Sequence, residues 1–313
     1  MRLTKKIFQP LVILAVLAAL LLGAPAYLLA AGDQTPYQLV VLGDPHIPGK
    51  FLAEKAAVIR TINSWPDVKL VVAVGDICQD LGTEKEYAAA AQFFRNLAKP
   101  FVPIPGNHDF IYDDSKTLDG KRIKNTAAEK ANKLARFQKT FGLPALYHSK
   151  LIDNYLLIFL ATDDVQSDQL TRISQKQLGW LRSELNRNKK INTIIFFHGP
   201  LYGTLSSYNN YANSNDFIAQ PQDDIRELLR QNPQVFLWVC GHMHVPATSK
   251  DFRSSINVYE NKVDTLHNSD MNRETIWTNS LFLFHDKVII KTYNHRLGAW
   301  LPELEKILVP PRL

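Results

Sequence analysis

The chain has 313 residues, of which 46% are hydrophobic and 21% charged, and this balance excludes a disordered, collagen-like or disulfide-scaffold protein. Its formal net charge is +6, but residues 1–31 hold three of the 36 basic side chains and no acid, so the remainder carries only +3. The basic clusters of that remainder have acidic neighbours and no interleaved aromatic residues, which disfavours a nucleic-acid partner.

The N-terminus begins with a short basic segment that is followed by the uncharged, mostly apolar residues 7–31. This order is typical of an export signal. The stretch is also long enough to cross a bilayer, so a cleaved signal peptide and a retained membrane anchor both remain open for residues 1–31. Either fate predicts an extracytoplasmic location for the rest of the chain, whether secreted, periplasmic or anchored.

From residue 37 onward, short apolar strands alternate with helices. We expect strands at 37–42, 68–74, 101–104, 156–161, 193–197, 235–239, 281–284 and 288–293, and helices near 51–63, 84–98, 127–141, 174–188 and 222–231. This alternation predicts an α/β domain with a largely parallel central sheet over residues 37–295. Residues 110–148 are expected to form an insertion or cap, and residues 296–313 a C-terminal tail.

Metal-type side chains follow five of the predicted buried strands. They are Asp44 and His46, then Asp76, then Asn107, His108 and Asp109, then His198, and finally His242 and His244. Because the carboxyl ends of parallel strands share one edge of a sheet, we expect these loops to converge on one crevice. Burying so many imidazoles and carboxylates without a metal would leave polar groups unpaired. Imidazole, carboxylate and amide ligands without a thiolate suit Mn, Fe, Zn or Co.

The motifs Asp-x-His, Gly-Asp, Gly-Asn-His-Asp, His and Gly-His-x-His occur in this order over residues 44–244 and resemble the calcineurin-like metallophosphoesterase superfamily. Residues 155–163 and 177–181 are similar to its cyclic-nucleotide-phosphodiesterase-like and purple-acid-phosphatase-like branch. The resemblance implies a four-layer α-β-β-α sandwich with a dinuclear metal site at the sheet edge. It also implies an exported enzyme that hydrolyses phosphate mono- or diesters with a hydroxide that bridges the two metal ions.

The resemblance further implies a role for each residue of these motifs. The first metal would be bound by Asp44, His46 and His244, the second by Asn107, His198 and His242, and both by Asp76. His108 would lie beside the metals without binding them, and would orient or protonate the substrate. Asp109 would support His108 or its loop, with a helix cap or turn as the alternative.

The sequence departs from two other branches of the superfamily. Purple acid phosphatases have a tyrosine ligand shortly after the bridging aspartate, whereas residues 77–80 contain none, so we expect no iron–tyrosinate site. Protein Ser/Thr phosphatases have an aspartate and a glutamate where this chain has Gln79 and Asp109. Cys78 and Cys240 flank the expected ligands, and both a mutual disulfide and small apolar packing remain open for them.

Two long polar segments leave from the expected metal site. The insertion follows Asp109, and a loop at 202–215 follows His198 closely and carries Tyr202, Tyr208 and Tyr211. We predict that both segments form the substrate wall, because long loops in compact domains are often functional. The tyrosines would stack on a flat leaving group. The alternative for each is an exposed ring that covers nearby apolar surface.

The predicted substrate is a phosphorylated small molecule, a nucleotide or a lipid, and any membrane contact would run through residues 7–31. A nuclease of the same superfamily is one alternative, but it would need a basic groove and usually a cytoplasmic address. A binding module that keeps the fold without catalysis is another. Such a module would have lost ligands, whereas every expected ligand is present in this chain.

Overall fold

The structure is a computed structural model that describes residues 35–205 and 208–313. The expected leader at residues 1–31 therefore lies outside the described residues. Residues Pro36–Leu313 form one compact unit. Within the described part of the chain, no helix combines the length and the apolar character that crossing a membrane requires.

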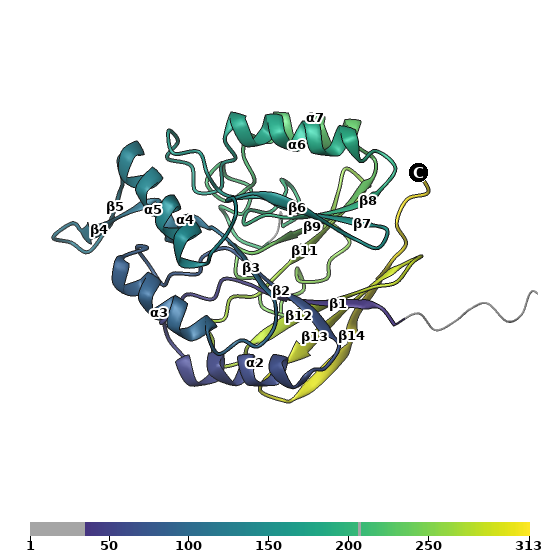
Figure 1. The fold of residues 1–313 in the computed structure, drawn as a ribbon, viewed down its shortest axis with the longest axis horizontal. Coiled ribbons are helices and arrows are strands. Elements are labelled where there is room, and N and C mark those ends of the chain that lie inside the picture. Colours follow the sequence, from purple (N-terminus) through teal and green to yellow (C-terminus); the bar gives the residue numbers. More distant parts are fainter. Residues whose placement is uncertain (1–34, 206–207) are drawn as a thin grey trace, which may run out of the picture. The chain divides into compact units, whose positions relative to one another are not determined.

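Two six-stranded sheets lie at the centre of this unit (Figure 1). The first sheet has the order β14 (Ala299–Leu308), β13 (Val288–Asn294), β12 (Trp277–Leu283), β1 (Tyr37–Leu42), β2 (Val68–Val74) and β3 (Phe101–Ile104). The second has the order β10 (Val258–Tyr259), β11 (Val263–His267), β9 (Val235–Cys240), β8 (Asn192–Phe196), β7 (Tyr155–Phe159) and β6 (His148–Ile152). A small separate hairpin consists of β4 (Tyr112–Lys116) and β5 (Arg122–Lys124).

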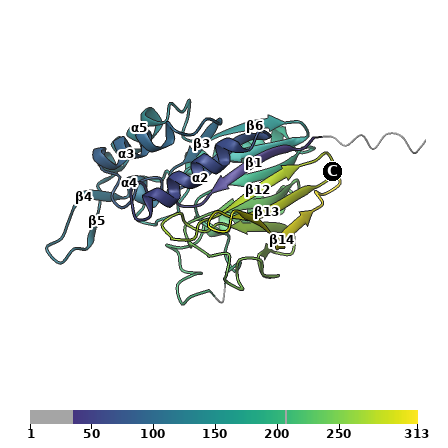
Figure 2. The same cartoon turned by 90° about the horizontal axis from the view of Figure 1, so that it is seen from below.

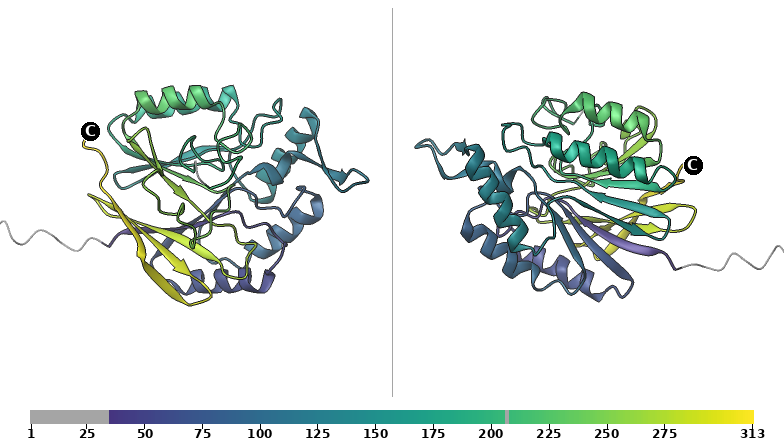
Figure 3. Two further views of the ribbon diagram at one scale, coloured as in Figure 1. Left: turned by 180° about the vertical axis from the view of Figure 1, so that it is seen from behind. Right: turned by 45° about the horizontal axis from the view of Figure 1, so that its top comes forward.

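Helices cover the outer face of each sheet, so the layers run helix, sheet, sheet, helix (Figures 1 and 3). The first sheet is covered by α2 (Leu52–Ser64) and α3 (Glu84–Phe94), with α5 (Ala127–Thr140) beside α3. Figure 2 shows α2 lying across this sheet. The second sheet is covered by α6 (Gln175–Arg187) and α7 (Gln222–Gln231). This arrangement is the four-layer sandwich expected from the resemblance.

The apolar runs of the central strands are explained by burial on both faces. In β1, Leu39 and Val41 point into the core between the sheets, whereas Val40 and Leu42 point toward the helices. Successive side chains of a strand alternate between faces, so a strand that is covered on both sides needs a continuous apolar sequence. Cys78 and Cys240 are buried in the two apolar clusters that lie between each sheet and its covering helices. Both thiols are free, so the cysteines serve as small apolar packing residues and do not form a disulfide.

Parallel pairing brings the functional loops to one edge. Strands β1, β2 and β3 are mutually parallel, as are β7, β8, β9 and β11. The carboxyl ends of the strands in each group therefore share an edge of their sheet, as the sequence predicts. The segment after β3 turns at once into the short helix α4 (Asn107–Phe110), which carries the Asn-His-Asp motif.

The structure corrects two sequence-based expectations. The strand–helix alternation predicts a largely parallel central sheet, whereas both sheets of the sandwich are mixed, because β12, β13 and β6 pair antiparallel with their neighbours. The expected tail at 296–313 contains β14, which pairs antiparallel with β13. The polar residues and Pro302 within this segment mask the strand in the sequence, and they are tolerated because β14 is an edge strand with an irregular register.

Candidate metal centre

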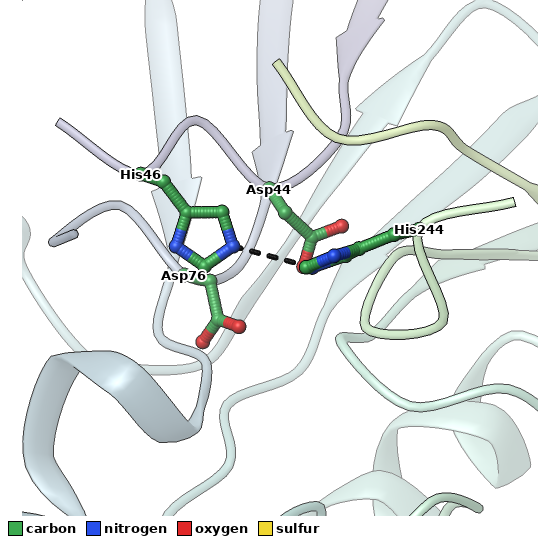
Figure 4. A group of neighbouring side chains, drawn as sticks. All are labelled: Asp44, His46, Asp76 and His244. Carbon is green, nitrogen blue, oxygen red and sulfur yellow. Dashed lines mark hydrogen bonds and ion pairs between the residues drawn. The ribbon is translucent and has the colours of Figure 1, made fainter. Parts of the chain in front are cut away.

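The seven predicted ligands converge at the carboxyl edge of the sheets and form two overlapping groups. Ligand atoms of Asp44, His46, Asp76 and His244 all lie within 4.8 Å of one another (Figure 4). Ligand atoms of Asp76, His198 and His242 meet the same condition, with Asn107 beside them. Asp76 is the residue that the two groups share.

In the first group, ring nitrogens and carboxylate oxygens point at a common centre. His46 Nε2 lies 3.2 Å from His244 Nε2, as Figure 4 shows, and His244 Nε2 lies 3.6 Å from Asp44 Oδ1. Asp44 also accepts hydrogen bonds from the backbone N–H of His242, at 2.9 and 3.0 Å, so it connects the loop after β1 to the loop after β9. Imidazole and carboxylate donors that face one another in this way match a metal-ion site.

In the second group, His198 Nε2 occupies the middle. It lies 3.0 Å from His242 Nδ1, 3.1 Å from Asn107 Oδ1 and 3.3 Å from Asp76 Oδ2. His198 is fully buried at the end of β8, where water cannot satisfy its ring. Nitrogen, amide oxygen and carboxylate oxygen atoms therefore surround one point from four different loops.

Backbone carbonyls fix the orientation of three of these imidazoles. In each ring, the nitrogen that faces away from the centre donates to a carbonyl. His46 Nδ1 donates to Gln79 O at 3.0 Å, His198 Nδ1 to Val74 O at 2.8 Å, and His242 Nε2 to Asp216 O at 3.1 Å. When such a ring is neutral, the nitrogen that donates outward leaves the lone pair of the other nitrogen directed inward, as metal-binding histidines require.

The backbone is strained where it delivers these side chains. His46, Asp76, His242 and His244 all have positive φ angles, between 48° and 63°. Such conformations are uncommon for residues other than glycine, and they concentrate at functional sites. Gly106 permits a close approach of two ligands, because a Cβ atom there would lie 2.3 Å from Asp76 Oδ1 and 2.8 Å from His198 Nε2.

The electrostatics of the centre favour bound positive charge. Burial opposes the charged forms of His198 and His244, but the carboxylates of Asp76 and Asp44 outweigh it and raise the pKa of both imidazoles to about 9. Burial likewise opposes ionisation of Asp76, yet the neighbouring histidines, His198 first, hold its pKa well below the usual value. Burial lowers the pKa of His46 to about 4 and that of His242 to about 3. Protons on two imidazoles thus supply positive charge that metal ions would otherwise bring.

His108 adjoins this centre without belonging to either ligand group. Its backbone N–H donates to Asp76 Oδ1 at 2.8 Å, and its ring Nδ1 donates to the carbonyl of Asp80 at 2.7 Å. The other ring nitrogen, Nε2, lies 3.9 Å from Asp76 Oδ2. The Asp80 carbonyl therefore fixes the ring so that Nε2 faces the metal centre.

Two buried charges hold the ligand loops in place. The carboxylate of Asp109 accepts backbone hydrogen bonds from Ile77, Cys78 and Gly106, at 3.2, 2.8 and 2.8 Å. Asp109 is fully buried and is absent from the described residues that line the cavity. Its hydrogen bonds from Ile77 and Cys78 fit the loop-supporting interpretation, and its hydrogen bond from Gly106 at the start of α4 fits the helix-cap alternative. Lys55 Nζ donates to the carbonyl of His46 at 2.7 Å, and burial lowers the pKa of Lys55 to about 7.

A cavity of about 600 Å³ opens over the centre. Its wall beside His108 is formed by Tyr112 and Arg122 from the insertion and by Leu170. Its wall beside His242 and His244 contains Tyr208, Tyr211 and Phe217. The insertion and the tyrosine loop therefore both border the cavity, whereas Tyr202 is half-exposed and is not among the described lining residues.

Sequence reasoning missed several residues of these walls. Tyr112, Arg122, Leu170 and Phe217 belong to no recognisable motif, and their places depend on how the long loops fold back. Phe217 had one signal, since it closely follows the three tyrosines of the polar loop. In the structure the Phe217 ring stacks on His242, with the ring centres 5.2 Å apart, and the centre of the Tyr211 ring lies 4.6 Å from that of Phe217.

Comparisons with known proteins agree with this geometry. Residues 37–246 match the model of the calcineurin-like phosphoesterase family. The chain is 24% identical over 222 residues to a protein from Arcobacter nitrofigilis named probable glycerophosphodiester phosphodiesterase GpdQ, covering 67% of this chain and 73% of that one. It is 25% identical over 228 residues to the 3',5'-cyclic adenosine monophosphate phosphodiesterase CpdA of Haemophilus influenzae, covering 68% of this chain and 72% of that one.

The fold is shared with a dimetal phosphatase from Danio rerio, with a TM-score of 0.60 at 12% sequence identity over 88% of this chain and 100% of that one. At that identity the likeness concerns the fold alone. The family match extends from the start of β1 to just beyond His244, and so includes every strand end that carries a candidate ligand. The chain therefore belongs to the calcineurin-like phosphoesterase family and is a metal-dependent phosphoester hydrolase.

Proposed function

We propose that the chain is a two-metal phosphodiesterase that hydrolyses small phosphate diesters. The observation that carries this proposal is the position of Asp76, which is the residue common to both ligand groups. A carboxylate in that position would be able to bind two metal ions at once, and two-metal sites are suited to displacement at phosphorus. The first ion would be held by Asp44, His46 and His244, and the second by Asn107, His198 and His242, each together with Asp76.

The donor chemistry fits such ions. The inward-facing atoms are imidazole nitrogens, carboxylate oxygens and one amide oxygen, and no thiol is among them, which suits Mn, Fe, Zn or Co. Bound here, the ions would polarise the phosphoryl oxygens and lower the pKa of a water molecule between them. The ring-fixing hydrogen bonds to Gln79, Val74 and Asp216 would keep the imidazole lone pairs directed at the ions.

His108 is the candidate general acid. Its Nε2 faces the cavity beside Asp76, while its Nδ1–H is committed to the Asp80 carbonyl. His108 would thus hold a proton at Nε2 and deliver it to the departing oxygen of the ester.

The preference for diesters is supported by the relatives, since both GpdQ and CpdA are named as phosphodiesterases. The test compares hydrolysis of bis(p-nitrophenyl) phosphate and p-nitrophenyl phosphate by the full chain after loading with Mn, Fe, Zn or Co. We expect a higher kcat/KM for the diester. A higher kcat/KM for the monoester would contradict the diester preference and would indicate that the enzyme is a phosphatase.

Asp76→Asn tests the shared ligand directly. We expect this variant to lose turnover and to bind less metal, because one neutral amide cannot replace a carboxylate that serves two ions. Asp67→Asn is the matched control, since Asp67 is exposed in the turn after α2 and should behave as wild type. Full activity and metal content in Asp76→Asn would contradict the assignment.

We also propose that the protein is exported, on the basis of the basic and apolar order of residues 1–31. A reporter that is active only outside the cytoplasm, fused after residue 313, should be active with the full chain. It should be inactive when residues 2–31 are deleted. Equal reporter activity with and without the segment would contradict export through it.

A further inference from the structure

The hairpin of the insertion is attached to the metal-site loop by one shared carboxylate. Arg122 Nε donates to Asp80 Oδ1 at 2.6 Å, and Lys116 Nζ lies 2.6 Å from Asp80 Oδ2. Lys116 and Arg122 are register partners in β4 and β5, so the hairpin presents both cations together. Because one carboxylate faces two cations, this cluster retains one positive charge.

Only one of these two cations reaches the cavity. Among the described residues that line it, Arg122 is the one lysine or arginine. Its guanidinium lies over the Tyr112 ring, 5.2 Å from the ring centre, and this stacking orients the group. Nε is engaged by Asp80, while no described residue accepts a hydrogen bond from the terminal Nη1 or Nη2. Donors of a fixed, planar cation are thus available at the cavity wall.

Arg122 lies on the same side of the cavity as His108. Asp80 connects the two, because its carbonyl accepts from His108 Nδ1 and its carboxylate accepts from Arg122 Nε. Tyr112 lies between them, with its ring 5.4 Å from that of His108. If His108 protonates the departing oxygen, the leaving group lies on the side of the cavity that also carries the Arg122 guanidinium.

We infer that Arg122 binds a second anionic group carried by the leaving group. The preferred substrates are then phosphodiesters whose leaving group bears a further phosphate or carboxylate. This inference rests on the proposed function, since it takes the side of His108 as the leaving-group side. An arginine presents paired donors that match the oxygens of phosphate and carboxylate.

The first test measures selectivity between two isosteric leaving groups. Methyl p-carboxyphenyl phosphate and methyl p-carbamoylphenyl phosphate differ in the charge of one substituent, and release of the phenol is followed by chromatography. In the wild type, kcat/KM should favour the carboxylate ester. Arg122→Gln should lower the ratio of the two kcat/KM values by about tenfold, the usual effect of losing one hydrogen bond between charged groups.

Lys116→Gln is the matched control. It removes the other cation bound to Asp80 but leaves the cavity wall intact, so the selectivity ratio should stay within about twofold of wild type, as for an exposed ion pair. An unchanged ratio in Arg122→Gln would overturn the inference. An equal fall in both variants would also overturn it, because the hairpin attachment and not the guanidinium would then set the selectivity.

A binding measurement separates this inference from the proposed function. Calorimetry on the metal-loaded chain compares methylenediphosphonate, which has two linked anionic groups and is not hydrolysed, with inorganic phosphate. Arg122→Gln should lower the affinity for methylenediphosphonate about tenfold more than the affinity for phosphate, whereas Lys116→Gln should leave the ratio of the two affinities unchanged. If neither ester is hydrolysed by the wild type, the proposed function fails, while the calorimetric ratio still decides the role of Arg122. Equal weakening of both ligands would show that Arg122 recognises only a single phosphate.

Discussion

Gly106 lies directly against two candidate ligands of the metal centre, and replacing it with alanine probes their arrangement with one methyl group. The backbone there is extended, with φ −105° and ψ −173°, which alanine adopts without strain. Any effect must therefore come from the Cβ atom. That atom would lie 2.3 Å from Asp76 Oδ1, 2.4 Å from Asp76 N and 2.8 Å from His198 Nε2.

The size of the effect follows from these contacts. Ordinary contacts of a Cβ atom begin near 3.4 Å, so Asp76 and the residue 106 loop must separate by about 1 Å. Relieving such overpacking costs about 1–3 kcal/mol of folding free energy. A displacement of about 1 Å at reacting groups lowers rates about 10²-fold. Gly106→Ala should therefore remain folded, with a lower melting temperature, less bound metal and about 10²-fold less activity.

Gly179→Ala is the control for the same chemical change. Gly179 lies in α6, and apart from its chain neighbours and the backbone of its own helix no atom of the described residues is within 4 Å of the position that its Cβ would take. This variant should keep its metals and activity and gain about 0.5–1 kcal/mol of stability, because alanine favours a helix over glycine. Metal analysis, thermal unfolding and hydrolysis of bis(p-nitrophenyl) phosphate measure all three properties. Wild-type metal content and turnover in Gly106→Ala would refute the close approach of these loops.

Three further predictions concern single groups of the site. His108→Ala should retain its metals but lose about 10²- to 10⁴-fold in rate, with a smaller loss for better leaving groups; an equal loss for every leaving group would indicate phosphate positioning instead. Tyr211→Ala should change the ratio of activities on aryl and alkyl diesters without changing metal content, and a parallel loss of activity and metal would show a purely structural role. Below about pH 9 the raised pKa values keep His198 and His244 protonated in the metal-free protein. Metal binding at pH 7 should therefore release about two protons, and the metal affinity should increase as the pH rises. Calorimetry in buffers of different ionisation enthalpy measures this release, and binding without proton release would contradict the pKa assignments.

The ligands themselves were predictable because each follows a buried strand. Strands β1, β2, β3, β8 and β9 are mostly apolar runs that a sequence shows clearly, and parallel pairing requires their carboxyl ends to share an edge within each sheet. What the pattern could not show is that each ligand group combines residues from both sheets. Asp44, Asp76 and Asn107 follow strands of the first sheet, whereas His198 and His242 follow strands of the second.

The substrate walls were not predictable for a physical reason. Arg122 and Tyr112 lie on a short, exposed hairpin whose strands lack an apolar face, so neither periodicity nor hydrophobicity reveals it. Its place depends on the ion pairs with Asp80, to which the family motifs assign no role. Strand β14 was missed similarly, because an edge strand tolerates charged residues and a proline that would exclude a central strand.

The central claim is that Asp76 serves two metal ions at once, and anomalous X-ray diffraction from metal-loaded crystals tests it most directly. We predict two anomalous peaks about 3.5–4 Å apart, each about 2.0–2.2 Å from a different oxygen or lone pair of the Asp76 carboxylate. One peak should also contact Asp44, His46 and His244, and the other Asn107, His198 and His242. A single peak, or two peaks of which only one contacts Asp76, would contradict the account.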